Sequence, residues 1–244
     1  MQENTGVATS TSHALSRRVP PRTSPRKTKP AILLVASPNN PTGNALTTDE
    51  MERLVSSIPQ QTIVVVDEAY ASFVSNDASY IRRLVETHPN IIVCRTLSKF
   101  YGLPGLRMGF GFIGKGEVME RFARYANMYL GYDRLSEEVA IAALKSDDHY
   151  REVARVMQEA REMYTREVGQ LPGFKVYESL ANFILIKYPI ALKERLQAAF
   201  KAQDYKVKFM NEPDINEHMR ITLGRREQNR TVCDTICTIA RGNE

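Results

Sequence analysis

Long hydrophobic runs, signal-peptide features and clustered cysteines are all absent from this 244-residue sequence. No apolar run approaches the roughly 20 residues that a membrane-spanning helix needs, and the first residues lack the pattern of a signal peptide. The three cysteines, Cys94, Cys233 and Cys237, do not have the spacing of a metal site, so we expect no metal. Few and scattered cysteines are typical of a reducing compartment. These absences predict a soluble, cytoplasmic protein with no membrane partner.

Acidic residues are scarce only at the start of the chain. Residues 1–30 contain six Lys/Arg and one acidic residue, whereas the rest of the chain contains 27 basic and 27 acidic residues. The basic segment is also rich in Pro, Ser and Thr, and such a composition cannot bury a core. We therefore predict a disordered tail over residues 1–30, with a targeting peptide or an anion-binding arm as alternatives. Because the remaining chain is balanced in charge, nucleic acid is the least favoured partner.

Apolar and amphipathic segments alternate after the tail. Continuous apolar runs are typical of strands that are buried on both faces, and they predict strands at residues 31–36, 62–70, 90–95 and 108–114. Helices are expected between them at residues 47–58, which begin with the capping-box pair Thr47 and Glu50, and at residues 79–88. This alternation predicts an α/β domain over residues 31–146, with a mostly parallel sheet covered by helices on both sides.

The second half of the chain has a different pattern. Three segments have helical composition, at residues 115–128, 135–146 and 148–169, and we expect a linking helix over residues 147–170. Residues 171–244 then predict a small C-terminal α+β domain, with strands at residues 174–179, 182–188, 205–209 and 219–224, a helix at residues 190–202 and a closing helix.

Polar side chains follow three of the predicted strands. In an open α/β sheet, ligands bind beyond the carboxyl ends of the strands. Residues 39–43, 67–70 and 96–107 all reach that edge. Together they supply an amide, a carboxylate, a phenol, two hydroxyls, an amine and a guanidinium. This set predicts a site for an anionic ligand that carries a carbonyl group.

The motifs "NNPTG", "DEAY", "SKFYGLPGLRMGF" and "RITLG" occur in this order from about Ala31 to the C-terminus. They resemble the fold-type I, pyridoxal-phosphate-dependent aminotransferases of class I/II, and most of all the histidinol-phosphate aminotransferase branch. The resemblance implies a PLP-transferase-like fold that is incomplete at its N-terminus, because the first motif follows only a short tail. It also implies a homodimer that uses pyridoxal 5'-phosphate to exchange an amino group between an amino donor and a keto acid or aldehyde.

The resemblance further implies a role for each residue that matches a motif. Lys99 would hold the cofactor covalently and act as the base at the substrate's α-carbon. Asp67 would pair with the pyridine nitrogen of the cofactor. Asn40 and Tyr70 would both donate hydrogen bonds to its phenolic oxygen.

Anion-binding roles are implied for five further residues. Thr96, Ser98 and Arg107 would bind the cofactor's 5'-phosphate, because hydroxyls and a guanidinium suit a dianion. Arg220 would hold the substrate carboxylate from the C-terminal domain. Lys208 stands where relatives usually carry an arginine that helps to hold an anionic end of the substrate. Since a lysine lacks the planar fork of an arginine, histidinol phosphate, other amino acids and phosphorylated amines all stay open as substrates.

Several alternatives accompany this interpretation. Lys99 could be a surface lysine, and Asn40 could have only a structural role in its turn. Asn39 and Glu68 are expected to be bystanders that bind no ligand. Asn182 also matches a position near the substrate. The whole chain could instead be a PLP-dependent decarboxylase of a phosphorylated amino acid, or a non-catalytic remnant that acts as an interaction subunit.

Overall fold

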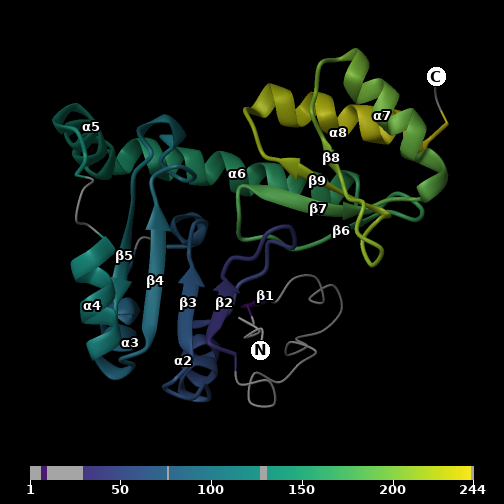
Figure 1. The fold of residues 1–244 in the computed structure, drawn as a ribbon. Helices are drawn as coiled ribbons and strands as arrows, with labels where there is room; N and C mark the ends of the chain where they lie inside the picture. The colour runs from purple at the N-terminus through teal and green to yellow at the C-terminus, as the bar shows by residue number, and fades with distance from the viewer. Residues whose placement is uncertain (1–6, 10–29, 76, 127–130, 243–244) are drawn as a thin grey trace. The chain divides into compact units, whose positions relative to one another are not determined.

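The computed structural model describes residues 7–9, 30–75, 77–126 and 131–242. The chain divides into two compact units, whose elements are labelled in Figure 1. The first unit takes in residues 1–39 and 45–146, and the second takes in residues 40–44 and 147–244. The short segment 40–44 therefore belongs to a different unit from the residues on either side of it.

The first unit contains a five-stranded sheet whose strands follow one another in chain order. The first four strands are parallel, and the last runs antiparallel to its neighbour. The mostly parallel α/β sheet that the sequence predicts is therefore present. Its strands are β1 (Val7–Thr9), β2 (Ile32–Ala36), β3 (Ile63–Asp67), β4 (Ile91–Thr96) and β5 (Gly109–Ile113).

Strand β1 lies within the segment for which the sequence predicts a disordered tail. It pairs in parallel with β2, and Val7 lies opposite Ile32. A strand of three residues is too short to show a periodicity, so the sequence did not indicate it. The rest of the predicted tail, residues 1–6 and 10–29, lies outside the described residues.

Two helices connect the parallel strands, α2 (Thr48–Ser56) and α3 (Ser79–Thr87). The predicted capping box at the start of α2 is confirmed. The hydroxyl of Thr47 accepts a hydrogen bond from the backbone N–H of Glu50 at 3.2 Å, and the Glu50 carboxylate accepts one from the backbone N–H of Thr47 at 2.9 Å. These bonds satisfy N–H groups that have no partner within the helix, and so fix where α2 begins.

Helices α2 and α3 pack on the same face of the sheet. Right-handed crossovers between strands that follow one another in sheet order require this arrangement. The opposite face is not fully covered in the described part of the chain, since Leu34 is 37% exposed there, in contrast to the expected cover on both sides. The buried core between the helices and the sheet consists of Leu33, Val35, Met51, Val55, Ile58, Val64, Val66, Ile81, Leu84, Ile91 and Val93.

Two further helices complete the first unit, α4 (Glu117–Ala126) and α5 (Arg134–Leu144). Helix α4 buries Met119 but exposes a second apolar stripe at Val118, Phe122 and Tyr125, which are 61%, 51% and 65% exposed. These three residues recur at the spacing of one helix face. An exposed apolar stripe of this kind is typical of a surface that contacts another protein.

The second unit is a small α+β fold, as the sequence predicts. Its four strands form an antiparallel sheet in the order β6-β7-β9-β8. No helix in the described ranges is both long and apolar enough to cross a membrane. The elements are α6 (Asp147–Glu167), β6 (Lys175–Val176), β7 (Phe183–Lys187), η3 (Ile190–Leu192), α7 (Lys193–Ala202), β8 (Lys208–Phe209), β9 (His218–Thr222) and α8 (Arg226–Ala240).

Helix α6 covers the segment for which we expected a linking helix, and it belongs to the core of the second unit. Ala160 and Tyr164 are buried in the same cluster as Cys233 of α8. The Tyr164 hydroxyl also donates a hydrogen bond to the carbonyl of Asn229 at 3.1 Å. Because Tyr164 is fully buried, this bond satisfies a hydroxyl that would otherwise be costly to bury.

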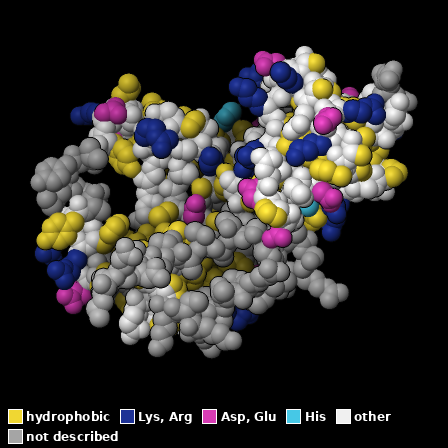
Figure 2. Space-filling model, turned by 45° about the vertical axis from the view of Figure 1, so that its right-hand side comes forward, with side chains coloured by type: hydrophobic (Ala, Val, Ile, Leu, Met, Phe, Trp, Pro, Cys, Tyr) yellow, Lys and Arg dark blue, Asp and Glu magenta, His cyan; other side chains and the backbone are white. Residues whose placement is uncertain are grey.

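Ion pairs join α6 to α8 at the surface. Basic and acidic side chains are interspersed on the face that Figure 2 shows. The guanidinium of Arg230 donates to both carboxylate oxygens of Glu167, at 2.9 and 2.6 Å. Hydrogen bonds from Arg230 lower the pKa of Glu167 to about 2. Since an ion pair of this kind stabilises the folded state only while the carboxylate is ionised, its contribution depends on pH.

Replacing Glu167 by glutamine should lower the free energy of unfolding at neutral pH by about 0.5–1 kcal/mol. A lowered pKa means that the contribution is present above the ordinary value of 4.5 and is lost as the pH falls toward about 2. Urea unfolding at a series of pH values measures this loss. The control is Glu178→Gln, at an exposed residue that has no ion pair with another described residue. A difference between Glu167→Gln and the parent chain that stayed constant down to pH 2 would contradict the assignment.

Candidate functional site

The carboxyl end of β3 presents a partly unpaired carboxylate. Asp67 is the last residue of the strand and is exposed. Its Oδ1 accepts a hydrogen bond from the backbone N–H of Ala69 at 2.9 Å, while Oδ2 has no partner among the described residues. In the register of the sheet it lies between Ala36 of β2 and Cys94 of β4. Asp67 is therefore held in place by its own turn, with one oxygen available to a ligand.

The loop after β4 brings hydroxyls and an amine close to this acid. The hydroxyl of Thr96 lies 3.0 Å from that of Ser98 and 3.1 Å from the carbonyl oxygen of Met108. Lys99 is exposed, and its Nζ lies 5.6 Å from the centre of the Tyr70 ring. Because β3 and β4 are parallel neighbours, the segments after them meet at one edge of the sheet. The amine of Lys99 and the phenol ring of Tyr70 thus lie close together.

The rest of the lysine loop turns back toward β4 through the 3₁₀ turn η2 (Pro104–Leu106). Gly102 has a φ of 66° and Arg107 a φ of 53°, both in the left-handed region. The backbone N–H of Leu97 then donates to the Met108 carbonyl at 3.2 Å, which places Arg107 beside the start of the loop. The guanidinium of Arg107 donates to the Pro104 carbonyl at 2.9 Å.

Aromatic rings support both sides of the lysine. Phe100 is buried directly after Lys99 and packs edge to face on Phe73 and Tyr101, with ring centres 5.0 and 5.3 Å apart. Phe73 ends the short 3₁₀ turn η1 (Ala71–Phe73) and lies 6.4 Å from the Tyr70 ring. Edge-to-face packing restricts the orientation of each ring. The two segments that carry Tyr70 and Lys99 are therefore fixed to each other through Phe73 and Phe100.

A second group of predicted residues lies in the second unit. Arg220 of β9 donates a hydrogen bond from Nη1 to the Oδ1 of Asn40 at 2.5 Å, and its guanidinium lies 5.4 Å from the Phe183 ring. Lys208 of β8 is the register partner of Arg220. Directly opposite residues of an antiparallel pair project from the same face, so two cations lie side by side here. Such a pair is suited to an anion.

The segment that carries Asn40 is bound to the second unit through its glycine. The carbonyl of Gly43 accepts a hydrogen bond from the backbone N–H of Leu180 at 2.8 Å. Gly43 has a φ of 76°, and a Cβ atom at this position would overlap the side chain of Ser179. Only glycine therefore satisfies both the backbone conformation and the close approach.

Replacing Gly43 by alanine should lower the free energy of unfolding of the second unit by about 2–3 kcal/mol, because strain and overlap add. The matched control is Gly242→Ala, where φ is 73° but a Cβ atom would meet nothing within 4 Å. The control should cost about 1 kcal/mol. Urea unfolding of both variants measures the difference. Equal losses would show that the approach to Ser179 has no energetic consequence.

The predicted residues thus form two groups. Glu68, which we expected to be a bystander, points to the opposite face of the sheet from Asp67, because successive strand residues alternate. There it forms a buried ion pair with Arg95, a residue that no sequence motif indicated. The first unit holds Asp67, Tyr70, Thr96, Ser98, Lys99 and Arg107, and the second unit holds Asn40, Lys208 and Arg220.

Known proteins resemble this chain in sequence and in structure. The family model for "Aminotransferase class I and II" matches residues 14–236. Histidinol-phosphate aminotransferase 1 of Trichormus variabilis is 31% identical over 211 residues, which are 86% of this chain and 58% of the relative. The chain therefore spans somewhat more than half the length of such relatives.

Two solved structures show the same fold. Histidinol-phosphate aminotransferase of Sinorhizobium meliloti, in complex with pyridoxal-5'-phosphate, matches with a TM-score of 0.77 and 23% identity, over 89% of this chain and 59% of that one. L-threonine-O-3-phosphate decarboxylase of Porphyromonas gingivalis matches with a TM-score of 0.73 and 22% identity, over 88% of this chain and 66% of that one. The fold is thus a fold-type I arrangement of an α/β unit and a small α+β unit.

Proposed function

The chain belongs to the class I and II aminotransferase family, and we propose that it carries out amino transfer with pyridoxal phosphate, between an amino donor and a keto acid or aldehyde. One observation carries the proposal beyond family membership. The Lys99 amine lies 5.6 Å from the Tyr70 ring, at the sheet edge where Asp67 presents an unpaired oxygen. An amine, a phenol and a carboxylate at one edge are the groups that this chemistry requires.

The residues of the first unit carry the functional groups that pyridoxal phosphate needs, and several of these groups are available to bind it. Lys99 forms no ion pair with a described residue, so its amine is available for a covalent bond. The free Oδ2 of Asp67 would hold a proton at the pyridine nitrogen. The hydroxyls of Thr96 and Ser98, 3.0 Å apart, and the guanidinium of Arg107 would hold the phosphate. Tyr70 would donate to the phenolic oxygen, and the same role is proposed for Asn40.

Proton transfer in the proposed reaction depends on Lys99. When bound, pyridoxal phosphate supplies an electron-accepting ring that stabilises negative charge on the substrate's α-carbon. The Nζ of Lys99 would remove the proton from the α-carbon of the amino donor. It would later deliver a proton to the corresponding carbon of the acceptor. Arg220 would orient the substrate by binding the substrate's carboxylate. That carboxylate would compete with Asn40 for the guanidinium of Arg220.

The pair of Lys208 and Arg220 supports a substrate with two anionic groups. Lys208→Arg should lower the KM for histidinol phosphate roughly tenfold, because a guanidinium can bind a phosphate through two parallel hydrogen bonds. The control is Lys201→Arg, at an exposed residue near the end of α7. Steady-state kinetics measure both variants. A KM that is unchanged by Lys208→Arg would show that the phosphate lies elsewhere.

Decarboxylation is the second candidate, because a phosphothreonine decarboxylase shares the fold. One experiment separates the two reactions. The purified chain is incubated with pyridoxal phosphate and L-glutamate, and the products are identified. Pyridoxamine phosphate and 2-oxoglutarate would support amino transfer. Release of carbon dioxide from a phosphorylated amino acid would support the decarboxylase, and a chain that does neither would be a non-catalytic remnant.

A homodimer is the assembly that we propose, and the exposed stripe of Val118, Phe122 and Tyr125 on α4 supports it. A cytoplasmic location is also proposed, since all three cysteines are free thiols. Light scattering of the purified chain tests the first point. Replacement of Phe122 by glutamate should then shift the mass toward that of a monomer.

A further inference from the structure

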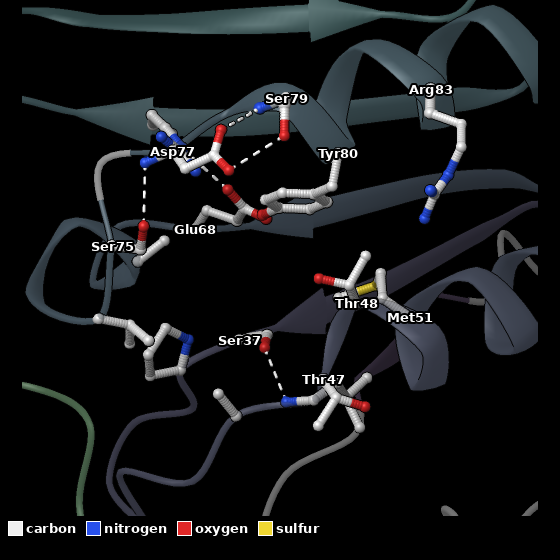
Figure 3. A pocket seen from close by; sticks show the side chains of 16 residues that line it. Ser37, Thr47, Thr48, Met51, Glu68, Ser75, Asp77, Ser79, Tyr80 and Arg83 are labelled. Carbon is white, nitrogen blue, oxygen red and sulfur yellow. Dashed lines mark hydrogen bonds and ion pairs between the residues drawn. The ribbon is translucent and has the colours of Figure 1, made fainter.

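A cavity of about 580 Å³ opens on the helix-covered face of the first unit (Figure 3). This volume is within the range of roughly 300–1,000 Å³ that is typical of small-molecule sites. None of the residues in the proposed cofactor or substrate sites lines it. The lining residues that matter here come from the segment before α2, the ends of β3 and β4, the segment between η1 and α3, and α3 itself; they are Leu46, Glu68, Val74, Asp77, Arg83 and Arg95.

A buried guanidinium is the main feature of the cavity. The Arg95 side chain is only 8% exposed, and its Nε donates to the Glu68 carboxylate at 2.9 Å. The hydroxyl of Tyr80 donates to the other oxygen of that carboxylate, so both oxygens of Glu68 are engaged. The two Nη groups of Arg95 have no hydrogen bond with any described residue. They are a ready-made fork for a carboxylate.

A second carboxylate, that of Asp77, lies near enough to this guanidinium to be affected by its charge. Asp77 accepts hydrogen bonds at 2.8 and 3.1 Å from the backbone N–H and the hydroxyl of Ser79. These bonds, together with a smaller effect of the Arg95 charge, keep the pKa of Asp77 below its ordinary value. Asp77 is therefore ionised at neutral pH. Arg83 is paired with Glu52 and Arg95 shares its Nε with Glu68, so the Nη groups of Arg95 and the carboxylate of Asp77 are the charged groups that a ligand in the cavity can meet, one of each sign.

The cavity also has an apolar side. Val74 and Leu46 line it and are 53% and 37% exposed. We propose that the cavity binds a small zwitterion, an α-amino acid with an aliphatic side chain. Its carboxylate lies on the Nη groups of Arg95, its ammonium group on Asp77, and its side chain against Leu46 and Val74. This site is separate from the proposed active site and does not depend on activity there.

Calorimetric titration with three matched probes tests the proposal. L-leucine carries both charged groups, 4-methylpentanoate lacks the ammonium group, and 3-methylbutylamine lacks the carboxylate. The titrations use the full chain as a Lys99→Ala variant without added pyridoxal phosphate, so that the proposed active site cannot react. L-leucine should bind at least about tenfold more tightly than either analogue. Equal affinities, or no binding of L-leucine, would overturn the proposal.

Variants locate the binding. Asp77→Asn should lower the affinity for L-leucine to that for 4-methylpentanoate. Val74→Trp should abolish the binding of L-leucine by filling the cavity. The matched control is Val139→Trp, at an exposed valine of α5 that does not line the cavity, and it should leave binding unchanged. Arg220→Ala should also leave it unchanged. Binding that Val74→Trp spares, or that Arg220→Ala removes, would place the amino acid elsewhere and overturn the proposal.

Discussion

Replacing Lys99 by alanine should abolish covalent attachment of pyridoxal phosphate and reduce the rate of amino transfer roughly 10²- to 10⁴-fold. The expected loss is large because the same amine would hold the cofactor and move the proton at the α-carbon. Absorbance spectra with added pyridoxal phosphate measure the attachment, and coupled production of 2-oxoglutarate from L-glutamate measures the rate.

A second lysine of the same unit serves as the control for this prediction. Lys115 follows β5 and is exposed. Lys115→Ala therefore removes one positive charge, as Lys99→Ala does, but at a position outside the proposed site. This variant should retain the spectrum and the rate of the parent chain. If Lys99→Ala kept both as well, the amine would have no part in the chemistry.

Replacing Arg95 by methionine should lower the free energy of unfolding by about 3–5 kcal/mol, because it leaves the Glu68 carboxylate buried without its partner. Glu68 is 3% exposed, and burial already raises its pKa despite the hydrogen bond from Arg95. Loss of Arg95 should raise that pKa further. A raised pKa means that stability is lost as the pH rises, so the deficit should grow from about pH 4.5, the ordinary value, to neutral pH.

Urea unfolding of Arg95→Met and Arg83→Met compares a buried with an exposed ion pair in the same unit. Arg83 bonds Glu52 at 2.7 Å, but the two side chains are 55% and 35% exposed. Its replacement should cost no more than about 1 kcal/mol. Equal costs for the two variants, or a deficit in Arg95→Met that does not change with pH, would contradict the role assigned to burial.

Local patterns in the sequence were sufficient for most of the fold. The capping box of Thr47 and Glu50 and the apolar runs of β2, β3 and β4 depend on neighbouring residues, so they could be read directly. Strand β1 could not, because three residues in a basic segment depend on pairing with β2. The open side of the sheet follows from strand order, which no local pattern contains.

Long-range contacts explain what the sequence missed in the site. Asn40 follows the first predicted strand closely, yet it belongs to the second unit because Arg220, 180 positions later, bonds to its side chain. Glu68 looked like a bystander of Asp67 because they are adjacent. Strict alternation along β3 was the available signal that they point to opposite faces. The pairing of Glu68 with Arg95 depends on the position of the neighbouring strand β4, which the sequence near Glu68 does not contain.

Peptide mapping after borohydride reduction tests the central claim most directly. The purified chain is mixed with pyridoxal phosphate, reduced, digested and analysed by mass spectrometry. The account predicts a single modified lysine at position 99, and loss of the modification when Asp67 is replaced by alanine. A label spread over several surface lysines, or confined to a lysine other than Lys99, would contradict it.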